Sequence, residues 1–165
     1  MDEELSGSAR RVQQALKELG ARGRVREMPA STRTAAEAAR AVGCTVGQIA
    51  KSLVFRTDGQ PPAVLVITSG KNRVDEGKLA RLLGAPARKA DADFVRAVTG
   101  FAVGGVPPVG LGTALPVLID EDLFAYAEIW AAAGTPRAVF PTTASELARL
   151  TGGRVVRIAV GPDAD

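Results

Sequence analysis

The chain has 165 residues, enough for one domain with a full core, and its 46% hydrophobic and 24% charged residues are ordinary for a soluble globular protein. It contains no histidine and a single cysteine, Cys44. This excludes Ser-His-Asp and Cys-His catalysis, HExxH metal sites and an internal disulfide. The formal net charge is +3. Arginines cluster at residues 10–11 and 22–26 and basic residues recur over 71–89, which fits a phosphate backbone as partner, although a solvated face is the commoner reason for such clusters.

The N-terminus carries three acidic residues in succession and no apolar segment of the kind that signal peptides have. No apolar run approaches the length of a membrane span. Together with the lone cysteine, these features predict a cytoplasmic protein that has no membrane partner.

In chain order, an amphipathic helix is predicted first, over residues 10–19, followed by a short strand over residues 25–28. Thr34 and Glu37 then have the spacing of a capping box. The box begins a helix whose alanine-rich face continues to Gly43.

The strand predicted over residues 47–55 is the most unusual element. Because strand side chains alternate, Lys51 shares a face with Ile49, Leu53 and Phe55. A lysine on an apolar face either extends along the sheet to reach solvent or is held in a cleft for a function. The pattern alone leaves both interpretations open.

The remaining elements follow from apolar runs, capping residues and terminal glycines. In order, they are a buried strand over 64–67, a helix from Asp75 to Gly84, a helix from Asp91 to Gly100, a strand over 116–120, a hairpin of strands 129–133 and 137–140, a helix from the capping box at Thr143 through Leu150, and a last strand over 154–160.

Helices and strands alternate, but hairpin-like pairs stand between the helices. We therefore predict an α+β fold, a single domain in which helices flank a mixed sheet, rather than a doubly wound parallel sheet. The domain is expected to span residues 1–165, with its core at about 25–160 and an N-terminal helix at about 8–20. The residues before 10 and after 161 are expected to be loosely held.

Residues 104–110, Gly-Gly-Val-Pro-Pro-Val-Gly, form the second unusual stretch. Adjacent glycines at 104 and 105 allow a close approach to the backbone, and two prolines stiffen the second half of the stretch. Such a loop can present main-chain groups to a small substrate, although an ordinary surface turn has the same composition.

The acidic turn at residues 120–122 is more typical of a solvated turn than of a cation site. Cys44 is interpreted as a small buried hydrophobe rather than a nucleophile.

Taken in order, these motifs resemble the YbaK/ProX family, free-standing relatives of the editing domain of bacterial prolyl-tRNA synthetase. The resemblance covers roughly residues 25–160 and is most specific in the lysine strand and in the Gly-x-x-x-Pro loop from Gly104 to Pro108. It implies a curved mixed sheet with helices around it. It also implies hydrolysis of mischarged aminoacyl-tRNA, such as cysteinyl- or alanyl-tRNA of the proline type.

On this resemblance, Lys51 holds the 3′-terminal adenosine by its phosphate, and Gly104 and Gly105 supply main-chain groups around the amino acid and the water, with Pro108 fixing the loop. The substrate's own 2′-hydroxyl activates the water, which requires no cofactor and no metal. The remaining substrate-binding positions are expected at Ser52, Phe101, Val106, Asp120 (at the pocket mouth) and Ala132.

Two positions depart from the cysteine-specific members, which have serine where Pro107 stands and another serine near Ala132. An alanine-lined pocket can accept a different small side chain. The partners expected are the acceptor end of a mischarged tRNA and an aminoacyl-tRNA synthetase, with no role for DNA. The alternative is a non-catalytic module that binds tRNA ends, nucleotides or a synthetase without turnover.

Overall fold

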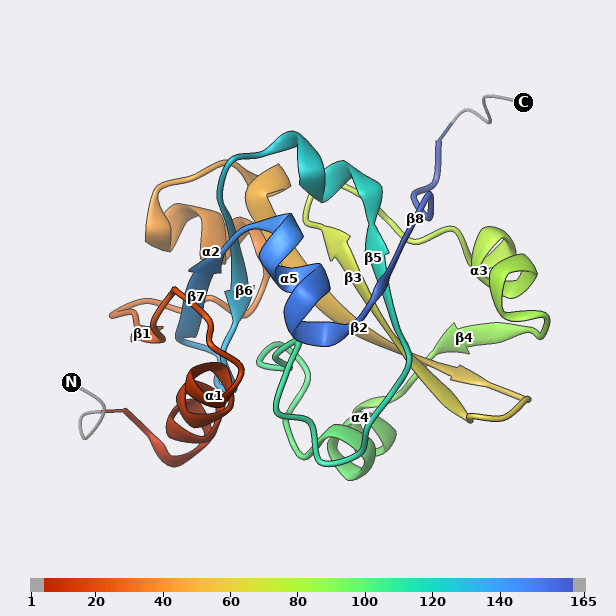
Figure 1. Cartoon of the computed structure of the whole chain (residues 1–165), viewed down its shortest axis with the longest axis horizontal. Coiled ribbons are helices and arrows are strands. Elements are labelled where there is room, and N and C mark those ends of the chain that lie inside the picture. Colours follow the sequence, from red (N-terminus) through yellow and green to blue (C-terminus); the bar gives the residue numbers. More distant parts are fainter. Residues whose placement is uncertain (1–4, 162–165) are drawn as a thin grey trace.

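In a computed structural model, residues 5–161 are described, and they form an eight-stranded mixed sheet with helices on both faces (Figure 1). The expectation of loosely held ends lies outside the described residues at 1–4 and 162–165. It is wrong just before residue 10, because the first helix already begins at Gly7, with Ser6 as its cap and Ala9 fully buried. The elements are α1 (Gly7–Glu18), β1 (Arg26–Glu27), α2 (Ala35–Val42), the 3₁₀ helix η2 (Val46–Gln48), β2 (Ile49–Thr57), β3 (Ala63–Ser69), α3 (Glu76–Leu83), β4 (Ala87–Lys89), α4 (Ala92–Thr99), β5 (Val117–Asp120), the 3₁₀ helix η3 (Glu121–Ala125), β6 (Ile129–Ala132), β7 (Ala138–Thr142), α5 (Ala144–Thr151) and β8 (Arg154–Val156).

The sheet runs in the order β1-β7-β6-β2-β3-β5-β8, and β4 pairs with the far end of β2. Strand β2 is antiparallel to β3 and β4 but parallel to β6. Parallel pairs also join β3 to β5 and β5 to β8. The predicted mixed sheet is confirmed, and so is the hairpin of β6 and β7.

The helix caps follow the sequence closely. Thr34 accepts a hydrogen bond from the backbone N–H of Glu37, whose carboxylate accepts one from the N–H of Thr34, as a capping box requires. Asp75, Asp91 and Thr143 cap their helices in the same position. Each of these four helices ends at a glycine in the left-handed conformation, which satisfies its last carbonyl groups.

Two strand predictions need correction, and one strand was missed. Gly47 and Gln48 lie in η2 and not in the strand, because the side chain of Gln48 accepts hydrogen bonds from Thr45 and tightens this segment into a turn. The last strand ends at Val156, and only Ala159 continues it, as an isolated bridge to Val74. Strand β4 was not predicted.

Helices cover both faces of the sheet. On one face α1, α4 and α5 pack over the main core, which includes Leu16, Val95 and Leu147. On the other face the apolar side chains form two separate clusters, one under α2 around Trp130 and one under α3 around Leu79. The uncovered part of this second face lies between these clusters, and the central strand β2 crosses it.

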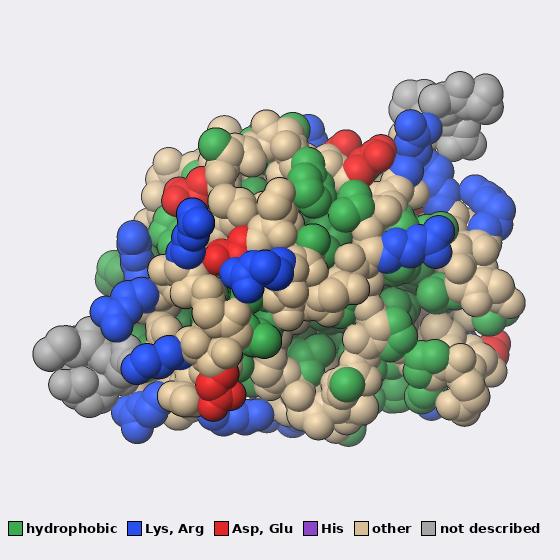
Figure 2. All heavy atoms as spheres, in the orientation of Figure 1, with side chains coloured by type: hydrophobic (Ala, Val, Ile, Leu, Met, Phe, Trp, Pro, Cys, Tyr) green, Lys and Arg blue, Asp and Glu red, His purple; other side chains and the backbone are tan. Residues whose placement is uncertain are grey.

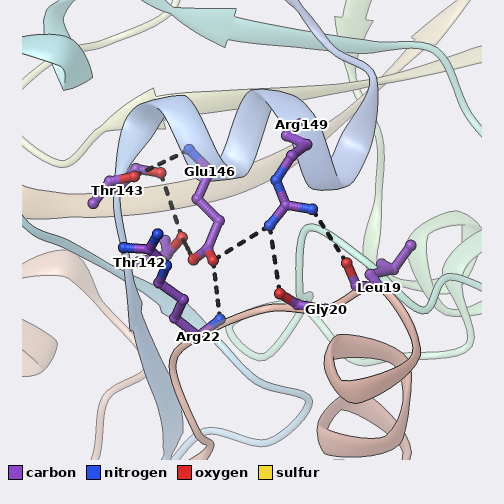
Figure 3. A network of polar contacts seen from close by, with 7 residues as sticks. All are labelled: Leu19, Gly20, Arg22, Thr142, Thr143, Glu146 and Arg149. Carbon is purple, nitrogen blue, oxygen red and sulfur yellow. Dashed lines mark hydrogen bonds and ion pairs between the residues drawn. The ribbon is translucent and has the colours of Figure 1, made fainter.

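A largely buried glutamate on α5 joins three parts of the chain (Figure 3). The carboxylate of Glu146 on α5 accepts hydrogen bonds from the N–H of Arg22 (3.0 Å) and the hydroxyl of Thr142 (2.6 Å), and its side chain is only 10% exposed. Arg149, one turn further on, lies 3.6 Å from the same carboxylate and donates to the carbonyl of Leu19. The network fastens the segment after α1, and the end of β7, to α5.

Across residues 5–161, every helix is too short or too polar to cross a lipid bilayer.

Candidate functional site

A cavity of about 280 Å³ lies where strands β2 and β6 stop pairing. The two strands are paired only at Ile49 with Trp130 and at Ala50 with Ala131. The next residues of both strands line the cavity, together with residues before α2 and the loop after α4. We call it the strand-gap cavity. Its lining residues are Thr32, Arg33, Thr34, Ala35, Ala38, Ile49, Ala50, Lys51, Ser52, Leu53, Val54, Lys89, Ala90, Val95, Val103, Gly104, Val106, Trp130, Ala131, Ala132 and Val139.

Lys51 lies at the uncovered part of β2. Its neighbours on the same face, Ile49 and Phe55, belong to the α2 and α3 clusters respectively, so that the lysine stands between them. The side chain is half-buried, and its ammonium group donates a long hydrogen bond of 3.5 Å to the backbone carbonyl of Asn72. Burial lowers the pKa of Lys51 below its ordinary value, and the charge of Lys89 lowers it further. The site therefore favours an added anion beside this lysine.

Two further cations line the strand-gap cavity, Arg33 and Lys89, both of them exposed. None of the described residues that line it is acidic. Lys51 and Lys89 also border a shallower hollow of about 420 Å³, whose wall includes Arg73. The two lysines therefore line both hollows; the wall of the second hollow also includes the acidic residues Asp75 and Glu76, whereas the described lining of the strand-gap cavity contains none.

The glycine loop contributes unequally to the cavity. Gly104 lines it and has a φ of +92°, and a Cβ placed there would lie 2.6 Å from Cγ of Arg33. Gly105 packs instead against the turn after β6, where a Cβ would lie 3.0 Å from backbone atoms of Thr135. The carbonyl of Gly105 also accepts a hydrogen bond of 2.8 Å from the N–H of Gly134. A side chain larger than hydrogen is therefore disfavoured at both positions, but for different reasons. At Gly104 it would meet the side chain of Arg33 at the cavity, and at Gly105 it would meet the backbone of Thr135.

Of the other sequence-predicted residues, the structure places Ser52, Val106 and Ala132 at the strand-gap cavity, together with Lys51 and Gly104. The hydroxyl oxygen of Ser52 is buried and has no hydrogen-bond partner among the residues that the structure describes. A buried polar group without a partner costs free energy, and a ligand in the cavity can supply what is missing.

Phe101, Pro108 and Asp120 lie elsewhere. Phe101 is in the main core beneath the guanidinium of Arg11, and Pro108 is buried beyond the glycines. Asp120 is 1% exposed and lines neither of the two hollows described, so its expected place at the pocket mouth is wrong. Its carboxylate accepts hydrogen bonds from Thr68 Oγ1 (2.9 Å), Ser69 N (3.0 Å) and Asn72 Nδ2 (2.8 Å) at and just after the end of β3, and from Asp122 N (2.9 Å) in η3.

Sequence reasoning did not assign Arg33, Lys89 or Trp130 to the site. Arg33 directly precedes the capping residue of α2, and Lys89 ends the unpredicted strand β4. Trp130 is buried on β6, with the guanidinium of Arg26 stacked 5.1 Å from its ring centroid. For Lys89, there was one indication in the sequence, its place in the basic cluster over residues 71–89. Its position at the cavity results from the pairing of β4 with β2, which the sequence did not predict.

Cysteine, aspartate and glutamate do not occur among the described residues that line the strand-gap cavity. Across residues 5–161, the Cys, Asp and Glu side chains form no group of three that could hold a metal ion. Cys44 is half-buried under α2, and burial raises the pKa of its thiol, with a smaller contribution from Glu128. A raised pKa disfavours the nucleophilic thiolate.

Comparison with known proteins gives consistent matches. The model of the aminoacyl-tRNA editing domain matches residues 29–150. An uncharacterized protein of Bacillus subtilis (strain 168), YwhH, is 30% identical over 131 residues, 79% of this chain and 83% of that protein. The proline–tRNA ligase of Nitratidesulfovibrio vulgaris (strain DP4) is 37% identical over 91 residues, 54% of this chain but only 16% of the ligase.

Among solved structures, the crystal structure of a candidate trans-editing enzyme for prolyl-tRNA synthetase is 57% identical, with a TM-score of 0.89 over 95% of this chain and 99% of that one. This similarity extends over nearly the whole of both chains.

Proposed function

Because this chain belongs to the aminoacyl-tRNA editing domain family, we propose that it is a trans-editing deacylase that hydrolyses the ester of a mischarged tRNA. The observation that carries the proposal is the strand-gap cavity, in which a half-buried lysine adjoins small apolar side chains and a buried, unpartnered hydroxyl. A terminal phosphate supplies the anion that Lys51 lacks, and the cavity accepts the esterified amino acid. We also propose that the chain acts as a single domain in the cytoplasm and that an aminoacyl-tRNA synthetase is its protein partner.

In the proposed reaction, water attacks the ester carbonyl carbon and the bond to the ribose oxygen breaks. The water's proton passes through the substrate's 2′-hydroxyl to the leaving ribose oxygen. Lys51 holds the phosphate and so fixes the ester in position for the water. Gly104 leaves room beside Arg33 at the cavity wall, and Gly105 keeps the loop against Thr135. The absence of histidine from the chain agrees with a substrate-assisted route.

The lining of the strand-gap cavity favours a small amino acid. Alanines at positions 50, 131 and 132 and Val106 form much of its wall, and the volume of about 280 Å³ is at the small end of ligand pockets. Alanyl- and cysteinyl-tRNA of the proline type are therefore the proposed substrates.

The direct experiment measures the release of amino acid from a panel of mischarged tRNAs, with correctly charged prolyl-tRNA as the control. We expect hydrolysis of at least one tRNA carrying a small amino acid, at a rate well above the spontaneous rate. Binding of these tRNAs without any release would support a non-catalytic module instead.

The affinity for tRNA is expected to fall steeply with salt. Figure 2 shows Lys and Arg side chains along the edge of the molecule that carries α1 and β1, where Arg10, Arg11, Arg24 and Arg26 are exposed. Each phosphate that such a surface neutralises contributes on the order of −0.7 to −0.9 to the slope of log K against log salt. Titrations at several salt concentrations measure the slope. A slope near zero would contradict a phosphate-backbone partner.

Alanine substitutions at Gly104 and Gly105 are expected to distinguish an effect on the hydrolysis rate from an effect on the stability of the fold. Gly104→Ala places a Cβ against Arg33 at the cavity and should slow hydrolysis about tenfold, at a stability cost of about 1–2 kcal/mol for the positive φ. Gly105→Ala should mainly destabilise, by about 1–3 kcal/mol, because the backbone at Thr135 must move. Hydrolysis rates and urea unfolding of both variants provide the measurements.

Gly152→Ala is the matched control. This glycine also has a positive φ, of +67°, but it ends α5 and has no atom within 4 Å of its Cβ position. We expect it to lose stability like Gly104→Ala and to keep the wild-type rate. Equal rates for the two variants would remove Gly104 from the site.

A further inference from the structure

Between its pairing with β6 and its pairing with β4, strand β2 has an open edge. Its last pair with β6 is at Ala50, and its first pair with β4 is at Phe55. In the part of the chain that the structure describes, no strand pairs with residues 51–53 on this side. The strand-gap cavity occupies this position.

Strand alternation shows which main-chain groups point into the opening. The carbonyl of Ile49 bonds to the N–H of Gly70 beyond β3, and the carbonyl of Val54 bonds to the N–H of Ala90 beside β4. Odd-numbered residues of β2 therefore bond toward β3 and even-numbered ones toward β6 and β4. Both the N–H and the C=O of Ser52 consequently face the gap, with no strand opposite them.

The opposite wall provides a second acceptor. The N–H of Ala133 bonds to the carbonyl of Ala138, so the odd-numbered residues of β6 and its extension bond toward β7. Ala132 has the other orientation, and its carbonyl faces β2 just beyond the last pair, at Ala131. Two carbonyl oxygens, from Ser52 and Ala132, thus border the same opening.

The charges around the cavity define what these carbonyls can bind. Its charged lining residues are the cations Arg33, Lys51 and Lys89, and none of the described residues that line it is acidic. A positively charged group that enters can be held only by neutral acceptors. Main-chain carbonyls are such acceptors, and backbone groups hold terminal amines in this way in peptide recognition.

We infer that the open main chain of Ser52 and Ala132, in the gap between β2 and β6, binds the α-ammonium group of the esterified amino acid. The identity of this ligand depends on the proposed function. The ammonium donates hydrogen bonds to the carbonyls of Ser52 and Ala132, and the N–H of Ser52 remains to donate to the ligand's carbonyl oxygen. The amino acid thereby extends the sheet where β6 ends, and Lys51 holds the nucleotide outside.

The test uses non-hydrolysable adenosine 5′-phosphates whose 3′-amino group carries either alanine or propionate, which differ in the α-ammonium group alone. Calorimetric titration of the wild-type protein should show at least about tenfold weaker binding of the propionyl compound, as expected for loss of charged hydrogen bonds. In amide NMR spectra, the resonances of residues 52, 53 and 133 should shift with the alanyl compound and much less with the propionyl one.

Ser52→Ala is the discriminating variant, because it removes the hydroxyl and retains the main chain. The alanyl-to-propionyl affinity ratio should persist in it, whatever the change in absolute affinity. A ratio near one in the wild-type protein, or a ratio that vanishes in Ser52→Ala, would overturn the inference while tRNA hydrolysis and its dependence on Lys51 remained. If neither compound binds and no tRNA is hydrolysed, the proposed function fails, and the inference fails with it.

Discussion

Replacing Lys51 by alanine is expected to slow the hydrolysis of a mischarged tRNA by about two orders of magnitude or more, as loss of a positioned electrostatic group does. The ammonium is half-buried and has one long hydrogen bond, so a bound phosphate becomes its main partner. The fold should be preserved. Since burial lowers the pKa of Lys51 in the folded state, its protonation opposes folding, and removal of the charge carries no such penalty. Single-turnover hydrolysis and thermal melts measure the two effects.

Lys51→Arg and Lys89→Ala are the companion variants. Arginine retains the charge but has a longer, planar head group, so we expect only partial recovery of the rate. Lys89 borders both hollows but is exposed, and its loss should weaken tRNA binding with a much smaller effect on the single-turnover rate at saturation. A folded Lys51→Ala protein that hydrolyses tRNA at the wild-type rate would refute the proposed site.

Replacing Asp120 by alanine is expected to lower the free energy of unfolding by about 3 kcal/mol or more, because two buried and two partly buried donors lose a charged acceptor together. The affected donors are Thr68 Oγ1, Ser69 N, Asn72 Nδ2 and Asp122 N. The loss also reaches the site. Asn72, whose side chain Asp120 holds, provides the carbonyl that accepts the hydrogen bond from Lys51. Urea unfolding measures the stability, and hydrolysis by the folded protein measures the effect on the site.

Asp122→Ala is the control for this prediction. Asp122 also accepts a hydrogen bond from Asn72 (2.9 Å), but it is only half-buried, and Asn72 retains Asp120 as an acceptor. We expect a loss of about 1 kcal/mol. If the Asp120→Ala and Asp122→Ala proteins unfold at the same urea concentration, the carboxylate of Asp120 is not the centre of this network.

The features that the sequence predicted correctly depend on near neighbours along the chain. The caps at Thr34, Asp75, Asp91 and Thr143 each involve residues three positions apart, and so they can be inferred without knowledge of the fold. Strand alternation correctly placed Lys51 with Leu53 and Phe55, since all three border the shallower hollow of about 420 Å³.

The features that the sequence did not predict depend on partners distant in the chain. Strand β4 is Ala-Arg-Lys, which has no apolar alternation, and it forms because Phe55, some thirty residues earlier, pairs with Lys89. Asp120 was expected at a pocket mouth, but the turn after β3 brings Asn72 over it. The strand-gap cavity requires the register of β6 on β2, which no local pattern contains.

The edge strands of the sheet affect the tendency of this protein to aggregate at high concentration. Its outer strands β1, β4 and β8 have only two or three residues each, and they carry Arg26, Arg88 and Arg154 respectively. A neighbouring molecule therefore finds short, charged edges that are poor templates for intermolecular β-pairing. The open edge at Ser52 lies between the pairing of β2 with β6 and its pairing with β4, so strands of the same sheet flank this short segment on both sides. The unpaired edge at which we propose ligand binding is therefore too short and too closely flanked to be a good template for β-pairing with another molecule.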